Sequence, residues 1–421
     1  MQENAPATPA SMADRFASDP YCVYAELRQA APVYRATMPD GSAAWIVTRY
    51  ADVRSALADG RLTKDPRVAT RARACRGDAA AAQPGEPASP LEDNMLCVDP
   101  PRHTRLRKLI NGEFTAGRVE RLRPRVQQIA DHLLSAIAPR GEADLIAEFA
   151  APLPVAVICE LIGIPAIDHE KFREWLTELA GITVTATTDA AQQAQREVAD
   201  YLGRQIDRKR AAPGDDLLSA LLDAKADDGS MLSGSELVSM LYLLLTAGHE
   251  TTANLIGSGV HALLGHPDQM ELLREQPGLL PSAVEEFLRY ESPFNVASAR
   301  FTVEATQIGG VTIPAGEAVL PAIGSANRDP DQFTDPDRLD VQRRAGGNLV
   351  FGHGVHYCAG AALARLEGEI AFGTLLRRLH GLRLAVPADQ LRWQRPCFLI
   401  RGLSELPVRF TPQPGRPVNG R

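Results

Sequence analysis

One cysteine of the chain stands in a setting that suits chemistry. Cys358 lies in the run Phe351-Gly352-His353-Gly354-Val355-His356-Tyr357-Cys358-Ala359-Gly360, directly before an apolar-periodic segment. Glycines at 352, 354 and 360 permit backbone conformations closed to other residues and let the chain pass close to a flat partner. A thiolate at a helix N-terminus is stabilised by the helix dipole and by free N–H groups, so this cysteine is a nucleophile or a metal ligand.

The same run decides between these two roles. It supplies no oriented base, which a nucleophile would need. A lone thiolate in an apolar, glycine-lined loop suits an axial ligand of haem iron. The alternative is a buried structural cysteine in a glycine-rich turn.

A second chemical segment is Ala247-Gly248-His249-Glu250-Thr251-Thr252. It lies inside a helix predicted from the capping sequence Ser233-Gly234-Ser235-Glu236 to about Leu264, which is apolar almost all round and therefore buried. Glycine inside a helix costs about 1 kcal/mol relative to alanine, so Gly248 needs a reason. Thr251 can donate its hydroxyl to the carbonyl of Ala247, and we expect the two features to open a local groove.

A third segment starts at Asp99-Pro100-Pro101 and continues as a basic helix. Asp99 is the predicted N-cap, with prolines in the first turn. His103 and Arg107 are four residues apart and share one helix face. Taken alone, such a pair is more often exposed than functional.

In this order and spacing, the three segments resemble the cytochrome P450 family of haem-thiolate monooxygenases, and the resemblance runs from about residue 15 to 410. It implies that Cys358 is the axial ligand of the iron of haem b. It also implies further contacts to the haem, through propionate donors and through residues against the ring: His103, Arg107, Arg300, His356, Ala247, Phe351 and Gly360.

The resemblance also assigns roles on the other side of the haem. Thr251 would hydrogen-bond the oxygen being activated, and Glu250 would relay protons from solvent. The family varies the position of His249 freely, so we give it no role. The alternative for Glu250 and Thr251 is a helix-cap or surface role.

Two further groups of residues follow from the resemblance. Glu286, Arg289 and Arg338 are assigned to a buried ionic network that fixes conformation rather than taking part in catalysis. Residues expected around the substrate are Leu96, Leu243, Ala247, Val296, Ala297 and Leu399.

The resemblance implies insertion of one oxygen atom from O2 into a small organic substrate, most like the enzymes that tailor polyketides, macrolides and other secondary metabolites. No flavin or iron–sulfur domain is expected after residue 410, so electrons would come from NAD(P)H through a separate ferredoxin and ferredoxin reductase. We expect the ferredoxin to meet a cationic face made of Arg105, Lys108, Arg343, Arg344 and Arg365; the alternative is a set of ordinary solvated cations. The alternatives are coupling, cyclisation or desaturation of such a metabolite, or a haem-binding partner protein without catalytic activity.

Composition agrees with this interpretation. The net charge of −7 argues against nucleic acid as the main partner. Six cysteines show no close pairing, which suggests a reduced, cytoplasmic protein, and no apolar run predicts a signal peptide or a membrane span. We expect a monomer with a disordered N-terminus (1–14), one haem-thiolate domain (15–410) and a C-terminal tail (411–421).

Periodicity predicts a mainly α fold with a small β region. Helices are expected at 20–30, 50–58, 118–139, 151–163, 168–180, 189–211 and 215–226, and strands at 32–36 and 43–48. Residues 60–95 lack regular periodicity, and a loop of that length is usually functional or disordered. The resemblance implies that this region lies over the substrate side of the haem, so we expect a mobile lid; the alternative is a solvated insertion.

Overall fold

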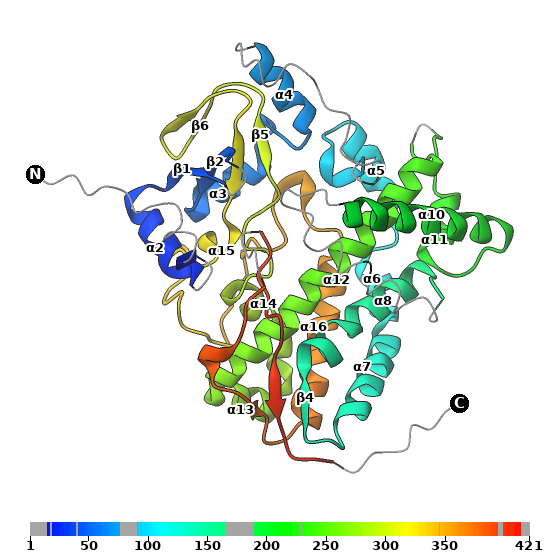
Figure 1. The fold of residues 1–421 in the computed structure, drawn as a ribbon, viewed down its shortest axis with the longest axis vertical. Coiled ribbons are helices and arrows are strands. Elements are labelled where there is room, and N and C mark those ends of the chain that lie inside the picture. The colour runs from blue at the N-terminus through cyan, green and yellow to red at the C-terminus, as the bar shows by residue number, and fades with distance from the viewer. Residues whose placement is uncertain are drawn as a thin grey trace, which may run out of the picture.

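Figure 1 shows a computed structural model of the chain. The structure describes residues 15–413 apart from 17–18, 39–40, 76–90, 92, 166–174, 176–188, 228, 345 and 395–398. The predicted disordered segment 1–14, the tail from 414 onward and the predicted helix 168–180, Trp175 excepted, lie outside the described residues.

Helices make up most of the described chain, as the periodicity predicts. They are α2 (Pro20–Ala30), α3 (Tyr50–Ala58), α4 (Pro66–Cys75), α5 (Arg102–Asn111), α6 (Ala116–Arg121), α7 (Arg123–Ile137), α8 (Pro152–Ile162), α10 (Asp189–Ala211), α11 (Leu217–Asp223), α12 (Gly234–Gly265), α13 (Pro267–Glu275), α14 (Leu280–Tyr290), α15 (Ile323–Ala326) and α16 (Ala361–Arg378). Of these, α4 corrects the expectation of an irregular segment over 60–95, since Pro66 starts a helix at a position where its missing N–H costs nothing.

The long helix α12 runs through the middle of the molecule (Figure 1). The predicted capping box is present, with Ser233 Oγ accepting from the N–H of Glu236 and Glu236 Oε2 accepting from the N–H of Ser233, both at 3.1 Å. The helix continues without a break through Gly248. A Cβ at Gly248 would lie 3.3 Å from Ile158 of α8, so close packing of the two helices gives this glycine a reason that the sequence pattern does not reveal.

The strands form three small sheets, which confirms the small β region. Five strands pair in the order β1-β2-β8-β5-β3, and only β2 and β8 run parallel. Smaller sheets pair β4-β10-β9 and β6-β7. The strands are β1 (Val33–Thr37), β2 (Ala43–Val47), β3 (Leu62–Thr63), β4 (Glu142–Asp144), β5 (Arg300–Thr302), β6 (Thr306–Ile308), β7 (Val311–Ile313), β8 (Ala318–Pro321), β9 (Arg383–Leu384) and β10 (Pro407–Arg409).

The main hydrophobic core surrounds α12 on both halves of its length. Its C-terminal half packs with α7, α14 and α16, and its N-terminal half packs with α8, α10 and α11. None of the helices in the described part of the chain is long and apolar enough to cross a membrane.

A buried ionic network joins α14 to the segment before the cysteine loop. Glu286 and Arg289, both fully buried, pair through two hydrogen bonds of 2.7 and 2.8 Å. The third member is Arg343, whose Nε lies 3.1 Å from Glu286 Oε1. The assignment of Arg338 is therefore wrong, because its side chain is exposed and only its backbone carbonyl accepts from Arg289.

Candidate active site

The cysteine loop lies between a 3-10 turn at Gly354–His356 and the start of α16. Gly352 and Gly354 have φ of 76° and 79°, in the left-handed region that favours glycine. A Cβ at Gly354 would lie 3.1–3.3 Å from atoms of Leu57 and Ala58 at the end of α3, so the loop also approaches α3 closely there. Gly360 differs from expectation: its φ is −83°, and a Cβ would meet nothing within 4 Å.

Cys358 is held by its backbone and keeps its side chain accessible. Its N–H donates to the carbonyl of Phe351 at 2.8 Å, and the thiol is exposed. Although solvent reaches Cys358, the protein packed around its other sides raises the pKa of the thiol; the N–H groups of Gly360 and Ala361 and the guanidinium groups of Arg107 and Arg365 act to lower it. The sulfur therefore faces N–H dipoles and positive charge, and a bound cation would favour its thiolate form.

Three predicted propionate donors meet beside this loop although they come from distant segments. His103 lies on α5, Arg300 begins β5, and His356 is two residues before the cysteine. The rings of His103 and His356 are 4.3 Å apart between centroids. Burial lowers the pKa of His103 to about 4, with His356 and Arg107 adding to the effect. Burial also lowers the pKa of Arg300 to about 10.

These side chains carry buried nitrogen atoms that no described residue satisfies. His103 Nδ1, Arg300 Nε and His356 Nε2 are all without a hydrogen-bond partner among the described residues. Buried polar atoms are normally paired, and each unpaired one costs about 1–3 kcal/mol. Nitrogen atoms of this kind, grouped beside an accessible thiol, fit the carboxylates of a haem.

Arg107, the fourth predicted propionate donor, makes a hydrogen bond within its own helix. It is half-buried, and its Nε donates to Asn111 Oδ1 at 2.8 Å on the same helix. Burial lowers the pKa of its guanidinium, and the charge of Cys358 raises it. Arg107 therefore lies near enough to the sulfur for the two charges to interact, and no second described residue accepts a hydrogen bond from its guanidinium.

Asp99 has a different role from the predicted N-cap. The N-cap position of α5 is Pro101, and the carboxylate of Asp99 instead accepts from the Thr63 hydroxyl and from the N–H of Lys64. Burial alone would raise its pKa, but the nearby His356, Thr63 and the Lys64 N–H hold the pKa of Asp99 at about 2. His356 Nε2 is 4.0 Å from Asp99 Oδ1, too far for a hydrogen bond.

The middle of α12 carries the second set of predicted residues. Thr251 Oγ1 donates to the carbonyl of Ala247 at 2.8 Å, as the spacing predicts, and Ala247 is exposed. Burial raises the pKa of Glu250 to about 7, so this carboxyl can gain and lose a proton near neutrality. Burial lowers the pKa of the neighbouring His249 to about 4, which keeps that imidazole neutral at pH 7.

Comparison with known proteins places this geometry in a family. The family described as Cytochrome P450 matches residues 175–381. Cytochrome P450 107B1 of Saccharopolyspora erythraea is 50% identical over 94% of this chain and 96% of the relative. The chain belongs to the cytochrome P450 family. This P450 is therefore an enzyme, a haem-dependent monooxygenase.

Two further comparisons show which members of the family this chain is similar to. The Mycinamicin IV hydroxylase/epoxidase of Micromonospora griseorubida is 45% identical over 91% of the P450 chain and 94% of the relative. The solved structure of PksS, the cytochrome P450 of the Bacillus subtilis bacillaene polyketide synthase, superposes with a TM-score of 0.85 at 39% identity, covering 94% of this chain and 98% of that one.

The residues predicted to surround the substrate differ in how far the P450 structure buries them. Leu243 is buried at 8% exposure on α12, Leu96 and Leu399 are half-buried, and Ala297 is buried. Val296 is fully buried in a core cluster with Tyr21, Tyr24 and Ile46, among others. This burial contradicts its assignment to the cavity wall, because core neighbours cover the whole side chain.

The predicted cationic face is largely neutralised in the P450 structure. Arg105 pairs with Glu236, Lys108 with Asp227 and Arg365 with Glu285. Arg343 belongs to the Glu286 network described above. Of the five predicted cations, only Arg344 is both exposed and without an ion pair to a described residue. The sequence missed these pairings because each acid lies far along the chain.

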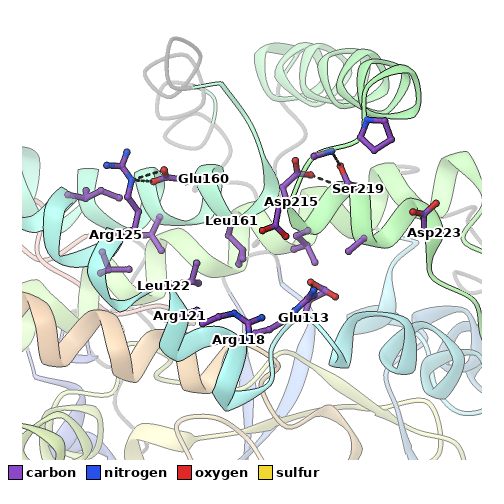
Figure 2. Close-up of a pocket in the computed structure, with 18 residues that line it drawn as sticks. Glu113, Arg118, Arg121, Leu122, Arg125, Glu160, Leu161, Asp215, Ser219 and Asp223 are labelled. Atoms are coloured by element: carbon purple, nitrogen blue, oxygen red, sulfur yellow. Dashed lines mark hydrogen bonds and ion pairs between the residues drawn. The ribbon is translucent and has the colours of Figure 1, made fainter. Parts of the chain in front are cut away.

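A cleft of about 510 Å³ on another part of the P450 is distinct from this site (Figure 2). It lies among α6, α7, α8 and α11, and Figure 2 shows Arg118 and Arg121 across from Asp215 and Asp223. The pairs Arg118–Glu113 and Arg125–Glu160 already neutralise much of its charge. None of the predicted haem, oxygen or substrate residues lines it.

Proposed function

We propose that this P450 holds haem b through Cys358 and uses Thr251 and Glu250 to manage protons during oxidation of a secondary metabolite. The observation that carries the proposal is the accessible Cys358 beside three buried nitrogen atoms, of His103, Arg300 and His356, that no described residue satisfies. When bound, haem supplies the iron at which dioxygen is activated for insertion of one oxygen atom into the substrate.

Separate groups of residues would bind the haem propionates and orient the cysteine loop. His103, Arg107, Arg300 and His356 would donate to the two propionates, where charge-assisted hydrogen bonds are strongest. Phe351 holds the N–H of Cys358, so the loop orients the sulfur. Phe351 also packs under the guanidinium of Arg365, whose Cζ lies 4.4 Å from the ring centroid.

On α12, the hydroxyl of Thr251 would move between two acceptors. It donates to the carbonyl of Ala247 in this structure and can turn to donate toward the oxygen. Glu250, with a pKa of about 7, would hold the proton that is passed on and recover it from solvent. The aliphatic side chains of Leu96, Leu243, Ala247, Ala297 and Leu399 would exclude water around the substrate.

For the substrate, we infer a polyketide or macrolide-like metabolite. Support comes from relatives named for the hydroxylation and epoxidation of mycinamicin IV and for a bacillaene polyketide synthase. A spectral titration tests this inference, because displacement of water from the iron changes its spin state. Macrolactones and linear polyketides should give saturable shifts at micromolar concentration, whereas fatty acids of similar apolar area should not. Saturable shifts with fatty acids but not with macrolactones or linear polyketides would reject the substrate class and leave the monooxygenase chemistry intact.

We further propose that electrons come from NAD(P)H through a separate ferredoxin and ferredoxin reductase. Tyr357, exposed and next to Cys358 in the chain, offers an aromatic contact, and Arg344, exposed and without an ion pair to a described residue, offers a cationic one. Since few free cations remain on this face, turnover supported by ferredoxin should depend only weakly on salt. A steep fall between 50 and 200 mM salt, about tenfold or more, would instead require a charged interface.

A further inference from the structure

Lys64, which no sequence pattern singles out, lies buried directly after β3. Only 5% of it is exposed. Its Nζ donates to the carbonyl oxygens of Ser298 and Ala299, both at 3.2 Å, and to the hydroxyl of Ser298. These acceptors are neutral, and no described carboxylate lies within ion-pair distance of Nζ. Lys64 therefore fixes the two residues that immediately precede Arg300.

The backbone of Lys64 makes a second connection. Its N–H donates to both carboxylate oxygens of Asp99, at 3.1 and 3.3 Å. Asp99 in turn lies 4.0 Å from His356 Nε2. Lys64 thus stands where the end of β3, the segment before β5 and the cysteine loop come together.

Positive charge exceeds negative charge around Lys64. Arg300 and Arg107 lie in the same region as the neutral imidazoles of His103 and His356, and among the described residues Asp99 is the carboxylate close to this group. Burial and the Arg300 guanidinium lower the pKa of Lys64 to about 7, while Cys97 and Asp99 act to raise it. Burial is the largest cause that lowers the pKa of His356, and the charge of Lys64 lowers it further. Buried positive charge is costly unless an anion pairs with it, so this cluster is suited to a dianion.

We propose that Lys64 is a positioning residue of the haem site, which holds Arg300 through Ser298 and Ala299 and adds one buried positive charge to the propionate cluster. The inference rests on the proposed haem site. Two effects should therefore be separable: one on how firmly the cofactor is held, and one on the electrostatic field at the iron.

The test compares Lys64→Met with the wild-type holoenzyme. Haem transfer to apomyoglobin should be about tenfold faster, because Arg300 loses its support. The ferric–ferrous equilibrium should shift about threefold to tenfold toward ferric iron, a fall of about 28–59 mV at 59 mV per tenfold for one electron. Lys64→Arg keeps the charge and should restore most of the potential. Ser298→Ala removes one acceptor only, and should speed haem transfer without moving the potential.

Lys209→Met is the matched control, because this half-buried lysine pairs with Asp216 beside the cleft of Figure 2 and should change neither quantity. If Lys64→Met keeps both the wild-type potential and the wild-type transfer rate, the proposal is wrong. If Lys64→Met does not accumulate as holoenzyme, haem transfer is measured in Lys64→Arg and Ser298→Ala instead. Wild-type rates of haem transfer in both variants would overturn the proposal. A wild-type protein that binds no haem would instead reject the proposed haem site itself.

Discussion

Arg343 Nε lies 3.1 Å from Glu286 Oε1, whereas Arg338, five residues earlier, offers the same network only its backbone carbonyl. Arg343 also donates to the carbonyls of Thr334, Asp335 and Arg338. One guanidinium thus holds the irregular segment that leads into the cysteine loop against the fully buried Glu286 of α14.

This arrangement predicts unequal effects of two arginine substitutions. Arg343→Ala should lower the free energy of unfolding by about 1–3 kcal/mol, because the fully buried Glu286 carboxylate loses one of its two guanidinium partners and keeps only its pair with Arg289. Arg338→Ala should change it by less than about 0.5 kcal/mol, as at other exposed positions. Urea unfolding of the two variants gives the comparison. Equal effects would mean that the network does not depend on Arg343.

Features set by neighbouring residues were accessible from the sequence. The helix at 50–58 and the capping box at Ser233 and Glu236 arise from local periodicity and local hydrogen bonds, and the structure has both. The hydrogen bond from Thr251 to Ala247 likewise spans a single helical turn. Such contacts need no knowledge of the rest of the fold.

Features set by distant partners were not accessible. The sequence offers arginines at 338, 343 and 344, and only the folded chain determines which one reaches Glu286. Asp99 would be a good N-cap, but its bonds to Thr63 and Lys64 take precedence. The extended segment around Val296 has two faces, and nothing in its local pattern tells which of them enters the core.

Substitution of Glu250 on α12 tests the proposed proton relay. Below pH 7 the Glu250 side chain, with its pKa of about 7, carries a proton that it can donate; above pH 7 it is ionised and cannot. Product formation should therefore fall as pH rises from 6 to 8. Glu250→Gln should be slower by about tenfold or more and should lose this pH dependence. A variant with the wild-type pH profile would exclude Glu250 as the donor.

Removal of the neighbouring hydroxyl tests Thr251 separately. Thr251→Ala should still bind substrate and accept electrons, but it should release much of its reducing power as hydrogen peroxide because the oxygen loses a hydrogen-bond donor. The ratio of product formed to NAD(P)H consumed should drop several-fold. Thr246→Ala, which removes a hydroxyl bonded to the carbonyl of Tyr242 one turn earlier, is the matched control and should keep the ratio. Full coupling in Thr251→Ala would contradict the assignment.

Two glycines test how tightly α12 is packed. A Cβ at Gly259 would overlap the ring of Phe372 on α16, so Gly259→Ala should cost about 1–3 kcal/mol despite the better helix propensity of alanine. A Cβ at Gly203 of α10 would meet nothing within 4 Å, and Gly203→Ala should gain up to about 1 kcal/mol. Thermal unfolding distinguishes them, and a stabilised Gly259→Ala would show that α16 can move away.

The central claim is that Cys358 is the axial ligand of the haem iron. The most direct measurement is the absorption spectrum of the reduced, CO-bound protein. We predict the red-shifted Soret band of thiolate ligation in the wild type and in Cys97→Ser, and its loss in Cys358→Ser. A Soret band at the histidine-ligated position in freshly prepared, folded wild-type protein would contradict the claim.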